Sequence, residues 1–180
     1  KPKGYSDVFD LEWINFSLEE RDREYSPSSV IGGDYKQFIN KYESESDIAR
    51  SVISSETFLY GIKPNQKIEI TSFNKNSNKN LKPILVFIHG GYWQELSIRE
   101  SFFPAINSVK NNIGYAAIDY TLAPDATLDE IVNECKLAID WLFNNTKKLG
   151  FDNKKIILAG SSAGAHLVAM YVIEKLKKSP

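Results

Sequence analysis

The sequence is poor in the residue types that most often build covalent cross-links and metal sites. It contains one cysteine, Cys135, and two histidines, His89 and His166, among 180 residues. A single cysteine excludes an internal disulfide and is typical of a reducing compartment, so we expect a cytoplasmic location. No group of His, Cys, Asp and Glu residues has the spacing of metal ligands, so neither a metal nor another cofactor is expected.

The sequence also lacks an excess of charge and a long apolar run. Its net charge is −1 at pH 7, so we expect no nucleic-acid partner and no anionic membrane surface as a partner. No apolar stretch approaches the ~20 residues of a membrane span, and residues 1–4, Lys-Pro-Lys-Gly, lack the apolar core of a signal peptide. The 42% of hydrophobic residues are enough for a sizeable core.

Hydrophobic patterning predicts an α/β fold. From Ile84 onward strands alternate with helices, which is typical of a mostly parallel sheet with helices on both faces. The helix after Thr127 is the most strongly indicated, because Thr127 and Glu130 form a capping box and Gly150 can end the helix. Helices are expected near residues 17–25, 34–54, 98–110 and 127–149, an antiparallel strand pair at 57–60 and 67–73, further strands at 85–88, 114–118 and 156–159, and a loop at 74–80.

Residues 160–164 read Gly-Ser-Ser-Ala-Gly, directly after an apolar strand pattern and before a helical one. This is the G-x-S-x-G pattern of a nucleophile elbow, in which a serine sits on a sharp strand-to-helix turn with its hydroxyl exposed. The alternative is a chance Gly/Ser pattern, which the strand-then-helix context disfavours. Ser162 is therefore the candidate nucleophile.

A second motif, His-Gly-Gly-Tyr-Trp, begins at His89 and follows an earlier apolar strand. Loops of this kind contribute backbone N–H groups to an oxyanion hole, so we expect the N–H groups of Gly91, Tyr92 and Ala163 to hold the oxyanion. His89 is expected to brace the loop rather than act as a base. Tyr92 and Trp93 either line a pocket for an aromatic substrate or pack beneath the loop.

The third motif is Asp-Tyr-Thr-Leu-Ala-Pro, which starts at Asp119 after another strand pattern. An aspartate at the end of a strand can be catalytic or can hydrogen-bond the backbone of the following turn. The turn residues that follow favour a structural role for Asp119.

Together these segments resemble the kynurenine formamidase (arylformamidase) branch of the α/β-hydrolases. The matching strings are HGGYWQ from His89, ATLDEIV at 126–132, SAGAHL from Ser162, EYSPS at 24–28 and SDIAR at 46–50. The resemblance implies an α/β-hydrolase fold and hydrolysis of N-formylkynurenine to kynurenine and formate. Ser161 stands where that family usually has histidine, which implies a different pocket lining.

The resemblance also implies residues that this sequence does not contain. In this fold the nucleophile is followed along the chain by an acid and then a histidine, yet only 18 residues follow Ser162. His166 lies one turn further along the same helix, which does not suit a general base. We therefore expect residues 1–180 to form one incomplete α/β-hydrolase domain, the N-terminal two-thirds of a longer enzyme, with an N-terminal arm and helices at 1–55 and the sheet core at 56–180.

Three functions stay open at this point. The first is an arylformamidase, the second a general small-acyl carboxylesterase, and the third a catalytically silent binding protein of the same fold. The expected partners are a small aryl formamide or ester, and either a second copy of the chain or the C-terminal remainder of the same protein, because the last strand would otherwise have an unpaired edge.

Overall fold

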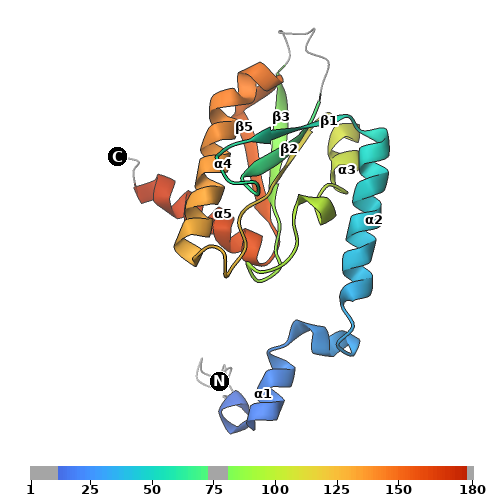
Figure 1. Cartoon of the computed structure of the whole chain (residues 1–180), viewed down its shortest axis with the longest axis vertical. Coiled ribbons are helices and arrows are strands. Elements are labelled where there is room, and N and C mark those ends of the chain that lie inside the picture. The colour runs from blue at the N-terminus through green and yellow to red at the C-terminus, as the bar shows by residue number, and fades with distance from the viewer. Residues whose placement is uncertain (1–11, 73–80, 178–180) are drawn as a thin grey trace, which may run out of the picture. The chain divides into compact units, whose positions relative to one another are not determined.

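A computed structural model describes residues 12–72 and 81–177 (Figure 1). The expected loop at 74–80 lies outside the described residues. The chain divides into two compact units, Lys1–Ile39 and Asn40–Pro180. The described elements of the first unit are η2 (Glu12–Asn15), α1 (Leu18–Glu24) and η3 (Pro27–Ile31).

The first unit contains the predicted helix near residues 17–25. A capping box begins α1, because the Ser17 hydroxyl accepts a hydrogen bond from the N–H of Glu20 while the Glu20 carboxylate accepts one from the N–H of Ser17. The next helix, α2 (Lys36–Val52), starts in the first unit and continues into the second.

The second unit is built around a five-stranded sheet. Its strand order is β1-β2-β4-β3-β5, in which β3 pairs in parallel with β4 and β5, while β2 pairs antiparallel with β1 and β4. This confirms the predicted α/β class and the antiparallel pair before it. The elements in chain order are β1 (Ser55–Leu59), β2 (Lys67–Thr71), β3 (Lys82–Ile88), η4 (Ile98–Glu100), α3 (Ala105–Lys110), β4 (Gly114–Ile118), α4 (Leu128–Leu149), β5 (Phe151–Gly160) and α5 (Ala163–Lys177).

Helices cover both faces of the sheet (Figure 1). Successive side chains of a strand point to opposite faces, and β3 divides its residues accordingly. Ile84, Val86 and Ile88 belong to the cluster that contains buried residues of α4 and α5. Leu85 and Phe87 pack against the cluster that includes residues of α2 and α3. Two apolar cores therefore fix β3 from either side.

Helix α4 has the ends that its sequence predicts. The Thr127 hydroxyl accepts a hydrogen bond from the N–H of Glu130, and the Glu130 carboxylate accepts one from the N–H of Thr127. Gly150 ends the helix in the left-handed region with φ 90°. Cys135 is buried on the inner face of α4 and is not in a disulfide.

The predicted helix over 98–110 is wrong in one respect, because the structure breaks it into η4 and α3. The hydroxyl of the buried Ser46, on α2, accepts hydrogen bonds of 3.0 Å from the N–H groups of Phe102 and Phe103. Those groups are no longer available to a continuous helix. Pro104 then stands at the cap position of α3, where its missing N–H costs nothing.

The last strand, β5, lies at the end of the sheet. It pairs with β3 on one side, and no other strand of residues 12–72 or 81–177 pairs with its outer side. Within those same residues, no helix has the length and apolar character needed to cross a membrane.

Candidate active site

The turn from β5 into α5 carries the predicted nucleophile. Ser162 is exposed and has φ 51°, a left-handed conformation that non-glycine residues adopt at a cost. The turn is tight because Gly164 packs directly against β3, where a Cβ atom would overlap the carbonyl oxygen of Ile88. Only glycine fits this close approach. The backbone therefore holds Ser162 at the tip of a strained strand-to-helix turn.

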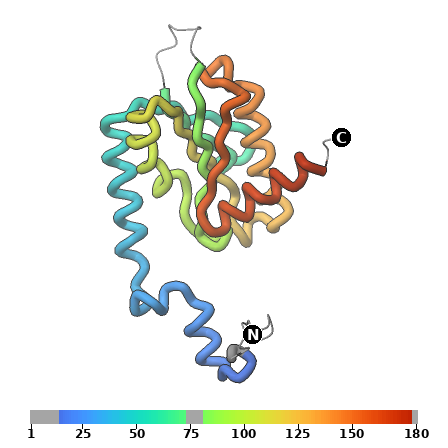
Figure 2. The backbone as a smooth tube through the Cα atoms, turned by 180° about the vertical axis from the view of Figure 1, so that it is seen from behind, coloured from blue at the N-terminus to red at the C-terminus, as the bar shows by residue number. Residues whose placement is uncertain are grey.

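The loop after β3 lies beside this turn, and both views of the backbone show the two segments side by side (Figure 1 and Figure 2). The N–H of Ser161 donates to the carbonyl oxygen of Ile88 at 3.3 Å. A Cβ atom built on Gly90 would lie 3.2 Å from the Cβ of Ser162. Tyr92 and Trp93 both have positive φ, at 51° and 61°, so this loop is as strained as the turn that it faces.

Two hollows meet at Ser162. The larger, of about 310 Å³, is lined by Tyr92, Trp93, Ser162, Ala163 and His166. The smaller, of about 140 Å³, is lined by Tyr42, Phe87, Gly90, Gly91, Leu96, Glu100, Ser101, Phe103, Ser161 and Ser162. Every residue that the sequence predicts for the site lines one of these hollows, and Ser162 lines both.

Three backbone N–H groups at the site find no acceptor in the part of the chain that the structure describes. Among residues 12–72 and 81–177, the N–H groups of Gly91, Tyr92 and Ala163 donate no hydrogen bond. Ala163 is the first residue of α5, so its own N–H has no acceptor within the helix. These groups are therefore available to an anionic oxygen near Ser162.

His89 lies beneath the loop and is 1% exposed. Its Nδ1 is 2.9 Å from the carbonyl oxygen of Gly90, its ring stacks on that of Tyr120, and its Nε2 is 3.4 Å from Oδ1 of Asp119. Asp119 also accepts from the N–H of Tyr120 and lies 3.5 Å from Nζ of Lys67. Both residues are thus engaged in supporting the loop, and neither lines the hollows.

His166 lines the larger hollow on the side of α5. Its ring contacts Trp93 edge to face, with 5.4 Å between the ring centroids. Its Nδ1 is buried and has no hydrogen-bond partner among the described residues. His166 therefore packs with Trp93 as part of the wall.

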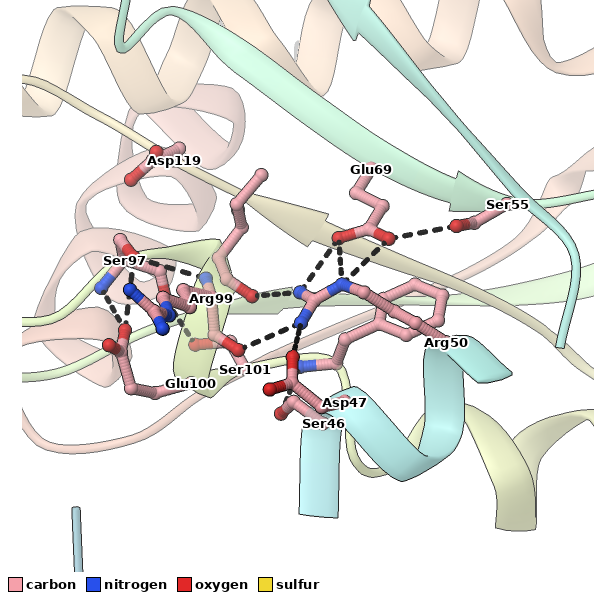
Figure 3. Close-up of polar contacts among 12 residues, drawn as sticks. Ser46, Asp47, Arg50, Ser55, Glu69, Ser97, Arg99, Glu100, Ser101 and Asp119 are labelled. Atoms are coloured by element: carbon pink, nitrogen blue, oxygen red, sulfur yellow. Dashed lines mark hydrogen bonds and ion pairs between the residues drawn. The ribbon is translucent and has the colours of Figure 1, made fainter. Parts of the chain in front are cut away.

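Arg50 anchors the segment that leads away from the loop (Figure 3). Its guanidinium binds the Glu69 carboxylate of β2 with contacts of 2.9 to 3.2 Å, and it donates to the carbonyl oxygens of Ile98 and Arg99 at 2.7 and 3.0 Å. One side chain thereby joins α2, β2 and η4. Because the next residue along, Glu100, lines the smaller hollow, Arg50 positions one wall of the site.

Sequence reasoning missed the outer part of the smaller hollow. Tyr42 and Phe103 stack there with ring centroids 5.3 Å apart and an angle of 6° between the rings, although they come from distant segments. A local signal did exist for Glu100. Residues 97–100 have the S-x-x-E capping-box pattern, and the structure forms that box.

Known proteins resemble this chain over most of its length. The kynurenine formamidase of Danio rerio is 29% identical over 167 residues, which cover 88% of this chain and 54% of that protein. The isoprenylcysteine alpha-carbonyl methylesterase ICME of Arabidopsis thaliana is 27% identical over 80% of this chain and 32% of that protein. The chain thus spans about half the length of the first relative and a third of the second.

Among solved structures, an esterase from Pyrobaculum calidifontis superposes with a TM-score of 0.62 at 24% identity, covering 81% of this chain and 48% of that one. This likeness confirms the predicted α/β-hydrolase fold. The family described as BD-FAE matches residues 70–179, which include β3, the loop after it and the turn around Ser162. The relatives are hydrolases, and this chain belongs to the BD-FAE family of α/β-hydrolases.

Proposed function

We propose that this protein is a serine hydrolase that cleaves small aryl formamides, with Ser162 as its nucleophile. The observation that carries the proposal is the position of Ser162, which combines φ 51° and an exposed side chain with a place in both hollows. Strained backbone of this kind is characteristic of nucleophile elbows.

In the proposed reaction the Ser162 Oγ attacks the formyl carbon and loses its proton to a base. The carbonyl oxygen becomes an oxyanion, which accepts hydrogen bonds from the N–H groups of Gly91, Tyr92 and Ala163. Collapse of the tetrahedral intermediate breaks the C–N bond, and the aryl amine leaves with a proton. Water then attacks the formyl ester, releasing formate and restoring the serine hydroxyl.

The general base is assigned to neither histidine of the chain. His89 is buried beneath the loop and does not line the hollows, and His166 packs its ring against Trp93 on the helix that starts beside Ser162. A base must come within hydrogen-bond reach of the serine hydroxyl. We propose that the base and its acid partner lie outside these 180 residues.

The proposed substrate is N-formylkynurenine, supported by the 29% identity to a protein named kynurenine formamidase. Aromatic side chains line both hollows at Ser162, Tyr92 and Trp93 the larger and Phe87 and Phe103 the smaller, and an aromatic wall favours an aryl group by about 0.5–1.5 kcal/mol beyond area burial. The second candidate is a small-acyl carboxylesterase, which the 27% identity to a methylesterase supports. Amide and ester cleavage share the same tetrahedral intermediate, so the same residues serve both.

The nucleophile can be tested with a fluorophosphonate probe on purified full-length protein. We expect labelling of the wild type at Ser162 and none of Ser162→Ala, with unchanged far-UV circular dichroism. Ser161→Ala is the matched control and should still be labelled. Labelling of Ser162→Ala would contradict the assignment and place the reactive nucleophile at another residue. An unlabelled wild type would favour the catalytically silent binding protein.

Substrate preference is measured as kcat/KM for N-formylkynurenine beside 4-nitrophenyl esters from acetate to palmitate. We expect turnover of the formamide and a fall in kcat/KM as the acyl chain lengthens, because a close-packed acyl pocket excludes longer chains. Rapid cleavage of short esters with no cleavage of the formamide would favour the carboxylesterase.

A further inference from the structure

We propose that the smaller hollow beside Ser162 binds a single aromatic ring that carries an ammonium group, and that Glu100 recognises the ammonium. This inference rests on the proposed function, because it assigns the leaving-group side of the same site. The ligand class follows from the size, the walls and the charge of the hollow.

The size of the hollow suits one six-membered ring. Its volume is about 140 Å³, and an apolar cavity of roughly 150 Å³ accepts benzene. Ser162 forms part of its wall, so a ring held there lies next to the reacting bond.

The outer wall of the hollow is aromatic. Tyr42 from α2 and Phe103 from the segment before α3 form the parallel stack, and Phe87 of β3 and Leu96 of the loop also contribute. Tyr42 is 43% exposed, so the stack stands at the mouth of the hollow. Aromatic walls favour flat aromatic ligands through offset or edge-to-face contacts.

The charge of the hollow comes from Glu100. Its Oε2 accepts hydrogen bonds from the N–H and the hydroxyl of Ser97 at 2.9 and 3.0 Å, which fixes the carboxylate. Among the residues that the structure describes, no lysine, arginine or histidine pairs with Glu100.

The neighbouring cations are already engaged. The Arg99 guanidinium pairs with Glu43, and that of Arg50 pairs with Glu69. No lining residue of the hollow is cationic. A half-buried carboxylate without a cation partner, beside an aromatic stack, favours an ammonium over a neutral or anionic group.

The experiment compares binding of two ligands of equal shape to full-length protein by calorimetric or NMR titration. Tyramine carries an alkylammonium on a phenol ring, and 4-propylphenol replaces the ammonium with a methyl group. We expect the wild type to bind tyramine at least tenfold more tightly. Glu100→Gln, which keeps an oxygen for the Ser97 hydrogen bonds, should remove that difference.

Glu56→Gln is the matched control, since it removes the same charge from β1, at the other edge of the sheet from β5. This variant should keep the tenfold difference in affinity between the two ligands. Tyr42→Leu should weaken the binding of both ligands at least threefold. The assignment would be overturned if the wild type bound the two ligands with equal affinity, or if Glu100→Gln lowered the affinity for both ligands by the same factor.

These outcomes are independent of catalysis. If the fluorophosphonate leaves Ser162 unlabelled, the proposed function fails while the binding comparison still decides the role of Glu100. If Ser162 is labelled and the two ligands bind equally, the hydrolase stands and the ammonium site is wrong.

Discussion

At the scale of single residues, Arg50 shows how one side chain can support a site that it does not touch. Its guanidinium contacts Glu69, which is 7% exposed, and two carbonyl oxygens of η4, and it lies over the ring of Phe102 at 5.2 Å (Figure 3). Planar, forked donors are required to reach all of these acceptors at once. Lysine has the charge of arginine without that geometry.

We therefore predict that Arg50→Ala lowers the free energy of unfolding by about 2–4 kcal/mol, because it leaves a buried carboxylate without its partner. Arg50→Lys should recover only part of this loss. The measurement is urea denaturation followed by circular dichroism. Arg23→Ala is the control, since the exposed Arg23–Glu24 pair is worth at most about 1 kcal/mol. Full recovery in Arg50→Lys would show that charge alone matters.

The residues of the site divide according to how far apart they lie in the sequence. The tight turn at residues 160–164 could be predicted because a turn motif is local, and each of its small residues is needed for the same backbone path. The place of Tyr42 and Glu100 at the site could not, because packing of α2 against the segment before α3 brings them to Ser162. The S-x-x-E pattern at residues 97–100 indicates a helix cap and not a place at the site. A pattern along the chain carries no information about such long-range contacts.

At the scale of elements, α4 is tied to the rest of the sheet by a buried carboxylate. Glu134 is 3% exposed and accepts hydrogen bonds of 2.8 Å from the N–H of Thr121 and from Nζ of Lys63. Burial by itself would raise the pKa of Glu134, but these donors and the Lys63 charge outweigh burial and lower it below its ordinary value. The folded state thus binds the ionised form more strongly than the unfolded state does.

This gives a signed prediction for the pH dependence of stability. The contribution of Glu134 is present above the ordinary glutamate pKa of about 4.3, and it is lost as the pH falls through the lower folded-state value. The free energy of unfolding of Glu134→Gln should therefore be about 1–3 kcal/mol lower than that of the wild type at pH 7. This difference in stability should be smaller at pH 3. Urea denaturation at pH 7, 5, 4 and 3 measures it.

Glu45→Gln, at an exposed position of α2, is the control and should track the wild type at every pH. If the difference in free energy of unfolding between Glu134→Gln and the wild type stayed constant from pH 7 to pH 3, the role given to the carboxylate charge would be contradicted.

Elements with their own end signals were predicted well. Helix α4 has a capping box and a terminal glycine in its sequence, and the structure uses both. The segment 98–110 has helical periodicity, yet its N–H groups at Phe102 and Phe103 bond to Ser46 more than fifty residues earlier. Tertiary hydrogen bonding overrides local propensity there, so no local pattern could have placed the break.

At the scale of the whole molecule, the alternation of strands and helices was enough to predict the α/β class, and the order of the strands explains the position of the site. Strands β3 and β5 run parallel to each other, so their carboxyl-terminal ends lie side by side at the same end of the sheet. The loop after β3 and the turn around Ser162 follow those ends. Open parallel sheets bind ligands beyond the carboxyl-terminal ends of their strands, because the loops that follow the strands gather there.

The same strand order leaves β5 as an edge strand with apolar side chains. Ile157 is 48% exposed on β5, and the adjacent α5 exposes Met170, Val172, Ile173 and Leu176. An edge strand offers unpaired backbone groups to another chain, and exposed apolar side chains strengthen that contact.

We predict that the 180-residue chain, expressed alone, associates through the β5 edge and gives oligomers in multi-angle light scattering. Ile157→Lys should shift the chain toward monomer, because a charge on an edge strand opposes pairing. Ile62→Lys is the matched control, since Ile62 is 100% exposed and lies between β1 and β2, away from that edge. It should leave the association unchanged. A wild-type chain that is monomeric and melts cooperatively would show that the β5 edge needs no partner. Equal effects of the two lysine variants on association would show that the contact does not involve β5.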